Sequence, residues 1–201
     1  HKSARRADTD SLAPHYARLV LGQHPLAAGQ SVRTSIDGAL QRYVMDSVDR
    51  HVRALQASNV RDAAVVVLDN SSGQVLAYVW SSGGLSLTAQ VDNARALRQA
   101  GSTLKPFLYA QALEQERLTT VSLLNDAPLN LPTGNGLYIP QNYDKHFSGW
   151  VSVRTALASS LNIPAVRTLV MVTPDAFQQR LVNLGLPLDR SGDFYGYSLA
   201  L

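Results

Sequence analysis

Two short apolar runs joined by a turn constrain the fold of this chain more than any other sequence feature. Residues 63–68 (AAVVVL) and 75–80 (VLAYVW) are rich in β-branched residues, and residues 69–73 (DNSSG) between them are typical of a turn. This pattern predicts a β-hairpin. Because two strands alone are not a stable sheet and the remaining periodicity is mostly helical, we expect an α+β fold whose sheet is incomplete within this chain.

The longest predicted helix lies ahead of this hairpin. Apolar residues recur at helical spacing over residues 36–55, and Thr34 with Asp37 would cap this helix as a capping-box pair. We interpret residues 1–33, which contain two prolines, as a linker with a short helix near residues 16–21.

The second half of the chain is predicted to be mainly helical around one long loop. Pro174 and Gly185 mark the start and the end of its last helix. Residues 125–150 are rich in proline and glycine, so we expect a long loop with little regular structure, of a kind that is usually functional. The helices are expected at residues 102–117, 153–161, 165–172 and 174–184.

Ser102 and Lys105 stand three residues apart in the stretch GSTLKP, and Pro106 limits where their helix can begin. Proline lacks an N–H and fits only in the first turn of a helix, so the helix must start close to Ser102. The hydroxyl then lies beside free backbone N–H groups, and Lys105 projects from the same face. A neutral lysine can take the serine proton, which makes this pair a candidate nucleophile and base.

A serine that simply caps a helix is the alternative interpretation of Ser102. The Ser-x-x-Lys pattern is short and often arises by chance. The chain contains fifteen arginines but only three lysines, however, so a lysine is less expected by chance at this position than in most proteins. Lysine serves as a base only where burial or nearby positive charge lowers its pKa.

A second short motif, Ser160-Leu161-Asn162, follows the long loop. In extended backbone, side chains two residues apart point to the same side. We expect Pro164 to end the preceding helix and to keep Ile163 extended, so that a hydroxyl and an amide face one cleft. The motif is weak alone and gains value from the Ser-x-x-Lys pattern before it.

Four stretches of the chain resemble the transpeptidase region of class A penicillin-binding proteins and lie in that family's order. They are VRTSIDGALQRYVMDSVDRHV, AAVVVLDNSSGQVLAYV, RQAGSTLKPFLYAQALEQ and PQNYDKHFSGWVSVRTALASSLNIPAVR. The resemblance covers nearly the whole chain from residue 12. It implies the front part of a serine transpeptidase fold of the kind shared with β-lactamases. Residues 1–60 would be a linker segment with a long helix, and residues 61–201 the N-terminal portion of the transpeptidase domain.

The resemblance also implies an activity, the transfer of an acyl group from a D-Ala-D-Ala peptide. Ser102 would be the nucleophile and Lys105 its general base. Ser160 would relay the proton to the leaving amine, and Asn162 would bind Lys105 and the substrate amide. Peptidoglycan stem peptides would be cross-linked through the acyl-enzyme, and β-lactam antibiotics would acylate Ser102 as inhibitors. No cofactor and no metal are expected.

The family's third motif, Lys-Thr-Gly or Lys-Ser-Gly on a strand beside the cleft, has no counterpart because no lysine follows Lys145. Arg190-Ser191-Gly192 matches in part, but its context PLDRSGDF indicates a turn. We therefore expect this chain to be inactive alone. A membrane anchor and a glycosyltransferase domain are expected upstream in the full-length protein, on the periplasmic side of the bacterial inner membrane.

Composition excludes several other classes of function. Without cysteine there is no disulfide, thiolate metal site or cysteine nucleophile. The net charge of +3 gives no indication of a nucleic-acid partner. No apolar stretch approaches the ~18 residues of a membrane helix.

Two alternatives to the transpeptidase remain open. A serine β-lactamase would need a base for the deacylating water. A non-catalytic β-lactam-sensing or interaction module could use the helix at residues 36–55 to dock another domain. Asn142 matches a family position without a derived role, and Trp150 is interpreted as a packing residue or a wall of the cleft.

Overall fold

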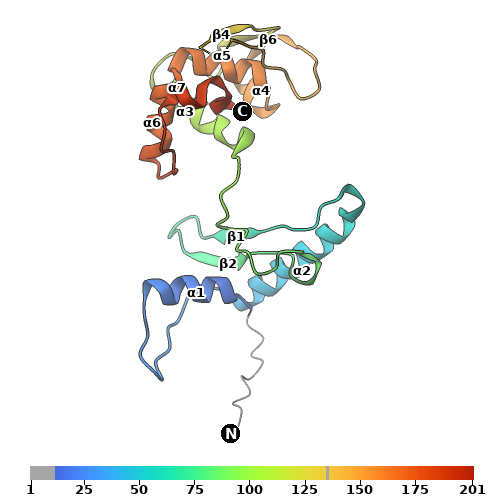
Figure 1. The fold of residues 1–201 in the computed structure, drawn as a ribbon, viewed down its shortest axis with the longest axis vertical. Coiled ribbons are helices and arrows are strands. Elements are labelled where there is room, and N and C mark those ends of the chain that lie inside the picture. Colours follow the sequence, from blue (N-terminus) through green and yellow to red (C-terminus); the bar gives the residue numbers. More distant parts are fainter. Residues whose placement is uncertain (1–11, 135) are drawn as a thin grey trace. The chain divides into compact units, whose positions relative to one another are not determined.

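The chain has an α+β fold in which helices are mixed with short antiparallel strand pairs (Figure 1). The structure, a computed structural model, describes residues 12–134 and 136–201, so the first eleven residues of the predicted linker lie outside it. In the described residues each of the three sheets has two strands. The chain divides into two compact units, His1–Arg98 and Gln99–Leu201.

The first unit contains the predicted helices and the predicted hairpin, which are confirmed. Strands β1 and β2 pair antiparallel, with Val65 opposite Val79. Helix α2 packs against β2 and buries an apolar face made of Val44, Val48 and Val52 against Ala77 and Val79. The elements are α1 (Pro14–Gln23), α2 (Gly38–Ala54), β1 (Val65–Leu68) and β2 (Val75–Val79), with 3₁₀ turns at Gln56–Ser58 and Gly83–Leu85.

The cap of α2 differs in one member from the prediction. Helix α2 begins at Gly38, and its N-cap is Asp37. The Asp37 carboxylate accepts the backbone N–H groups of Ala39 and Leu40 at 2.8 and 2.9 Å. A capping box headed by Thr34 is therefore wrong, because an aspartate at the N-cap satisfies these N–H groups by itself.

The free edge of β2 is covered by the chain that leads into α2. Asp37 donates its N–H to the Leu76 carbonyl at 2.9 Å. The side-chain amide of Gln41, fully buried, bonds both backbone groups of Tyr78, with Oε1 accepting the N–H at 2.7 Å and Nε2 donating to the carbonyl at 3.0 Å. The backbone of Asp37 and the side chain of Gln41 thus make the hydrogen bonds that a third strand would make at this edge.

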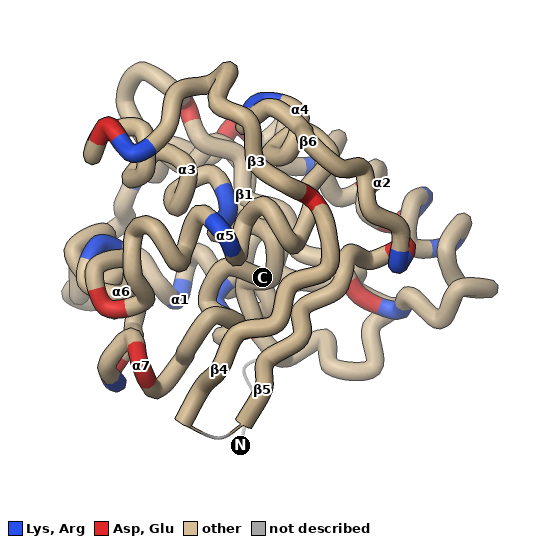
Figure 2. The backbone as a smooth tube through the Cα atoms, turned by 90° about the horizontal axis from the view of Figure 1, so that it is seen from above, with Lys and Arg blue, Asp and Glu red and all other residues tan. Residues whose placement is uncertain are grey.

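The second unit is built around α3 and α5, which pack against each other. Its core is formed by Leu108, Tyr109, Ala112, Leu169, Phe177 and Leu181, all almost fully buried. Figure 2 shows β4 and β5 running side by side as a ribbon without charged residues. The helices are α3 (Lys105–Glu114), α4 (Val153–Ala158), α5 (Asn162–Val172), α6 (Pro174–Asn183) and α7 (Gly192–Tyr195), with 3₁₀ turns at Gly101–Leu104 and Gly196–Ala200.

The predicted long loop, residues 125–150, contains more regular structure than we expected from the sequence. It contains or borders the strands β3 (Leu123–Asp126), β4 (Leu131–Thr133), β5 (Gly136–Tyr138) and β6 (Gly149–Ser152). Strand β3 pairs with β6, and β4 with β5, both antiparallel. Strands of three or four residues that include proline and glycine are too short to show a two-residue period, so the prediction of little regular structure is wrong here.

The later helices are confirmed with small shifts of their ends. Helix α6 begins with Pro174, as predicted, and Gly185 follows it in the left-handed region with φ +90°. None of the helices within residues 12–134 and 136–201 has the length and apolar character needed to cross a membrane.

Candidate active site

Ser102 lies where a helix begins, as we predicted from the position of Pro106. A 3₁₀ turn, Gly101–Leu104, runs directly into α3, and Pro106 stands in the first turn of that helix. Gly101 has φ +55°, a conformation that favours glycine. The Ser102 side chain is exposed, and its hydroxyl makes no hydrogen bond within the part of the chain that the structure describes. The nucleophile candidate is therefore open to an incoming group.

Lys105 is buried, with 1 % of its surface exposed, and its amine has three oxygen neighbours. Its Nζ donates to the Ser160 carbonyl at 2.6 Å, to Asn162 Oδ1 at 2.7 Å and to Ser160 Oγ at 3.2 Å. The two short motifs, more than fifty residues apart in sequence, therefore meet at one amine. The structure brings Lys105, Ser160 and Asn162 together, and Ser102 is tied to Lys105 through the helix turn, its carbonyl accepting the Lys105 backbone N–H.

Burial changes the acidity of this amine. Removal from water disfavours the charged form and lowers the pKa of Lys105 from 10.5 to about 8. Among the described residues Lys105 has no ion-pair partner that would oppose this effect. With a pKa near 8, roughly one amine in ten is neutral at pH 7. Lys105 can therefore serve as a base without a large free-energy cost.

Ser160 and Asn162 reach Lys105 by a different backbone path from the predicted one. Helix α4 ends at Ala158, Ser160 has φ +51° in the left-handed region, and α5 begins at Asn162. Pro164 lies in the first turn of α5, and Ile163 is helical. The expectation that Pro164 ends the preceding helix and keeps Ile163 extended is wrong. Proline is also favoured near the start of a helix, and here it marks the beginning of the next one.

Gln141 and Asn142, in the segment between β5 and β6, also bind Asn162. Asn162 Nδ2 donates to the Gln141 carbonyl at 2.8 Å, and the Asn162 backbone N–H donates to Asn142 Oδ1 at 2.8 Å. Asn142 itself is buried and bonds the carboxylate of Asp126. The sequence assigns no role to Asn142 and does not single out Gln141 or Asp126. No sequence pattern identifies these residues, because Gln141 and Asn142 lie in an irregular segment and their contacts reach the end of β3 and the start of α5, 16 to 21 residues away.

The remaining candidates lie apart from this cluster or take ordinary roles. Arg190 precedes the short helix α7 in a bend, as the predicted turn requires, and its guanidinium lies over the Phe194 ring at 5.4 Å. Trp150 stands on β6 opposite Asn125 and is 67 % exposed, so its interpretation as a packing residue is wrong within this chain. The described residues include no group of three or more histidines and acidic residues able to hold a metal ion.

The comparison with known proteins gives one consistent family. The family model for the penicillin binding protein transpeptidase domain matches residues 63–197. Penicillin-binding protein 1C of Escherichia coli (strain K12) is 34 % identical over 179 residues, which are 88 % of this chain and 22 % of that protein. The chain thus spans about a fifth of this relative.

Two solved structures share the fold. The crystal structure of penicillin-binding protein 1A from Haemophilus influenzae has a TM-score of 0.62 and 31 % identity, covering 70 % of this chain and 20 % of that one. The penicillin-binding protein PonA1 from Mycobacterium tuberculosis has a TM-score of 0.64 and 26 % identity, covering 82 % of this chain and 41 % of that one.

Proposed function

This chain belongs to the penicillin-binding protein transpeptidase family, and on that premise we propose that Ser102 forms the acyl-enzyme of a D-alanyl-D-alanine transpeptidase. One observation carries the proposal: the Lys105 amine, three residues after an exposed serine, is buried and held by Ser160 and Asn162. A serine one helical turn before an amine of lowered pKa suits acyl transfer, which needs a nucleophile and a base within reach of each other.

The proposed reaction has two steps of acyl transfer. Neutral Lys105 takes the Ser102 proton, and the serine oxygen attacks the carbonyl carbon of the penultimate D-Ala. The C–O bond forms, the C–N bond to the terminal D-Ala breaks, and the leaving amine takes up the proton through Ser160. The amine of a second stem peptide then attacks the ester, the new C–N bond forms, the ester C–O bond to Ser102 breaks, and the Ser102 oxygen takes up the proton that the amine loses.

The same proposal gives Asn162 two contacts. Its Oδ1 accepts from Lys105, while its amide group would bind the amide of the substrate. The backbone N–H of Ser102 would supply one donor to the oxyanion. The second donor would come from a strand carrying Lys-Thr-Gly, which has no counterpart after Lys145. Because loss of one such donor costs about 10²–10³ in rate, we propose that this chain acylates slowly by itself.

In the intact protein, the proposed substrates are peptidoglycan stem peptides, and the proposed inhibitors are β-lactams. The setting would be the periplasmic side of the bacterial inner membrane, with an anchor and a glycosyltransferase domain in parts of the protein outside this chain. Within the chain, residues 1–60 would be the linker and residues 61–201 the front portion of the transpeptidase domain. The family match, which begins at residue 63, supports this division.

Labelling with a fluorescent penicillin tests the activity. In the intact protein we expect one label, located at Ser102 by mass spectrometry, which is absent in Ser102→Ala and released slowly. Ser160→Ala should acylate at least tenfold more slowly, whereas Ser159→Ala, its exposed neighbour, should label like the wild type. Fast release of the label would indicate a β-lactamase, and no label at all a non-catalytic interaction module.

The 201-residue chain is tested separately with the same reagent. We expect labelling far below one label per chain under conditions that saturate the intact protein. Stoichiometric labelling of Ser102 in the isolated chain would contradict the proposed need for a further oxyanion donor.

A further inference from the structure

We propose that Asp126 and Asn142 are positioning residues for the reaction, acting through Asn162 on the Lys105 amine. Asp126 fixes which way the Asn142 side-chain amide faces, and Asn142 holds the start of α5 in place. The inference rests on the proposed function only for its rate measurement, since the position of Asn162 is independent of activity.

Asn142 performs the capping of α5 that the local sequence does not provide. The first N–H groups of a helix have no partner inside the helix and are usually bound by the side chain of the N-cap residue. The N-cap of α5 is Leu161, whose side chain cannot accept a hydrogen bond. Asn142 Oδ1 accepts the N–H groups of Asn162 and Ile163 instead, at 2.8 and 3.3 Å.

Asp126 determines the orientation of that amide. Asparagine can bond equally well after a half-turn that exchanges its oxygen and nitrogen, unless its partners accept only. Asn142 Nδ2 faces three acceptors, namely both carboxylate oxygens of Asp126 at 2.8 and 3.0 Å and the His146 carbonyl at 2.8 Å. Oδ1 is therefore directed to the N-terminus of α5.

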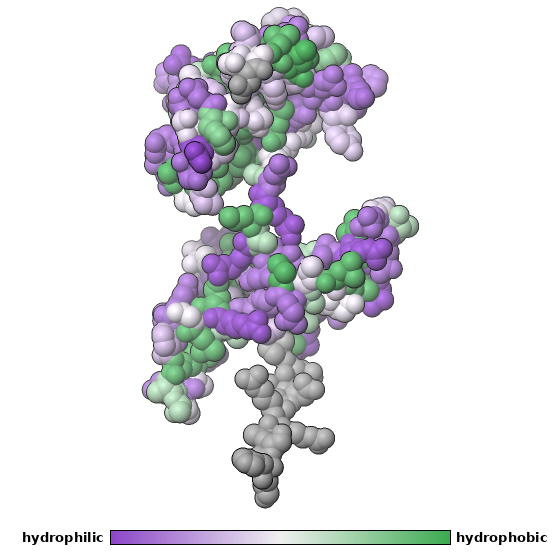
Figure 3. All heavy atoms as spheres, viewed as in Figure 1, coloured by the Kyte–Doolittle hydropathy of each residue, from purple (hydrophilic) through white to green (hydrophobic). Residues whose placement is uncertain are grey.

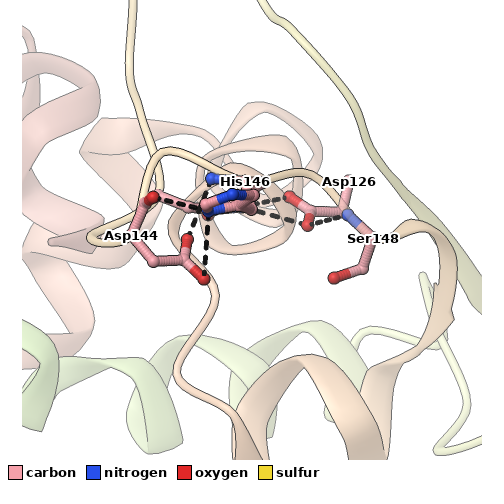
Figure 4. A network of polar contacts seen from close by, with 5 residues as sticks. Asp126, Asp144, His146 and Ser148 are labelled. Carbon is pink, nitrogen blue, oxygen red and sulfur yellow. Dashed lines mark hydrogen bonds and ion pairs between the residues drawn. The ribbon is translucent and has the colours of Figure 1, made fainter.

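The Asp126 carboxylate is itself built into the fold. It is fully buried at the end of β3, and its Oδ2 accepts the Ser148 N–H at 2.8 Å. Figure 4 shows Asp126 beside Ser148, with Asp144 on the opposite side of His146. Arg167 of α5 donates to the Asn125 carbonyl at 2.7 Å and so holds the chain just before Asp126.

The contacts of Asn162 transmit this order to Lys105. Its backbone N–H is held by Asn142, and its Nδ2 by the carbonyl of the adjacent Gln141 at 2.8 Å. With both held, Asn162 Oδ1 meets Lys105 Nζ at 2.7 Å. A displacement of about 1 Å in a catalytic group can cost on the order of 10²-fold in rate. If the Asn142 side chain loses its orientation, the acylation rate should therefore fall, although neither Asp126 nor Asn142 contacts Lys105.

The first test replaces Asp126 with asparagine, which has the same shape. An amide at this position replaces one of the two oxygens with an NH₂ group, and because Asn142 Nδ2 bonds both oxygens, it meets an N–H group in either orientation. We expect the acylation rate of the intact, folded protein to fall about tenfold or more. Asp144→Asn is the matched control. Asp144 is exposed in the same loop and accepts the His146 N–H at 3.0 Å without bonding Asn142, so its rate should stay within twofold.

The second readout follows the Lys105 amine itself and needs no activity. The sequence has three lysines, so a lysine-selective ¹³C label in the 201-residue chain gives few resonances to assign. We expect the Lys105 titration to move upward in Asp126→Asn, toward the ordinary value of 10.5, because a displaced Asn162 admits water.

Asn142→Ala is the second variant, in case Asp126→Asn does not fold. It leaves the Asp126 carboxylate with its Ser148 donor and removes the cap from α5. In either folded variant, a wild-type acylation rate or an unmoved Lys105 titration would overturn the proposal and leave Asp126 and Asn142 with a purely structural role. If the wild type does not acylate, the proposed function fails, while the titration still tests the positioning.

Discussion

The Lys105 amine is matched to three oxygen acceptors, which is the number of N–H groups that an ammonium carries. The same site removes the amine from water, and this burial lowers the pKa of Lys105 to about 8. The first effect favours the charged form and the second favours the neutral base. The amine is thus poised to lose a proton at a pH not far above neutrality.

A pH profile of acylation follows from this balance. Below a pH of about 8, the neutral fraction of Lys105 rises about tenfold per pH unit, and above it the fraction levels off. We expect the rate of penicillin acylation in the intact protein to follow the same curve between pH 6 and 9.5. A rate independent of pH across this range would exclude Lys105 as the base.

Asn162→Asp should shift that profile. The new carboxylate would stand where Oδ1 lies 2.7 Å from Lys105 Nζ, and an opposite charge at this distance raises the pKa of an amine. We expect slower acylation at pH 7 and recovery of most of the rate at higher pH. Asn162→Ala, which adds no charge, should lower the rate without moving the midpoint upward to the same extent. Equal midpoints in the two variants would argue against an electrostatic effect.

The two sequence motifs led to residues that lie in contact, but not to the backbone conformation that brings them together. Ser-x-x-Lys and Ser-x-Asn selected residues of which Lys105, Ser160 and Asn162 are in direct contact. The left-handed conformation of Ser160 has no sequence signal, because the residue usually found there is glycine. The Asp126–Asn142 pair was not predictable for another reason: a hydrogen bond between the end of a short strand and a loop produces no periodicity.

At the scale of elements, the C-terminus of α3 shows how helix ends are specified. The Arg117 N–H bonds the Ala112 carbonyl at 2.9 Å and the Glu116 N–H bonds the Leu113 carbonyl at 3.0 Å. These two bonds form the Schellman motif, in which the residue after the C-cap, here Glu116, lies in the left-handed region. Glycine is the usual residue there, but this chain has Glu116 with φ +55°.

Glu116→Gly should therefore stabilise the chain. The left-handed conformation costs a side-chain-bearing residue about 1 kcal/mol more than glycine, and the Glu116 side chain is exposed. We expect the free energy of unfolding, measured by urea titration, to rise by about 1 kcal/mol. Gln115→Gly is the control: Gln115 has φ −82°, so glycine adds only flexibility, and stability should fall. A loss of stability in Glu116→Gly would contradict this account of the helix end.

Elements with a long period were predictable and those without one were not. Helix α2 carries its apolar face over 17 residues, and the hairpin has β-branched strands on both sides of a turn. Strands β4 and β5 have three residues each, and one of them includes Pro132. They are defined by pairing with each other, which a local pattern does not report.

At the scale of the whole molecule, the two edges of the first sheet are treated differently. Gln41 and the segment before α2 cover the edge of β2, whereas β1 has no further strand among the described residues. Hydrophobic side chains reach the surface of each unit (Figure 3), and those of β1 include Val66 and Leu68 at 42 % and 53 % exposure. An uncovered apolar edge is a site where chains pair with one another.

Val66→Lys should reduce self-association of the isolated chain. A lysine on the solvent face of an edge strand opposes edge-to-edge pairing without entering the core. We expect light scattering of concentrated samples to fall while the circular dichroism spectrum stays unchanged. Leu97→Lys, at an exposed position outside the strands, is the matched control and should have little effect. Equal reductions in both variants would attribute the effect to net charge rather than to the edge.

The cap that Asn142 places on α5 has a consequence for hydrogen exchange. In most helices the first amides exchange their protons with water fastest, because nothing in the helix binds them. In α5 the amides of Asn162 and Ile163 are both bound by a buried side chain. Slow exchange should therefore begin at the first residue of this helix. The amide next to the Lys105 contact would open only when the neighbouring loop opens with it.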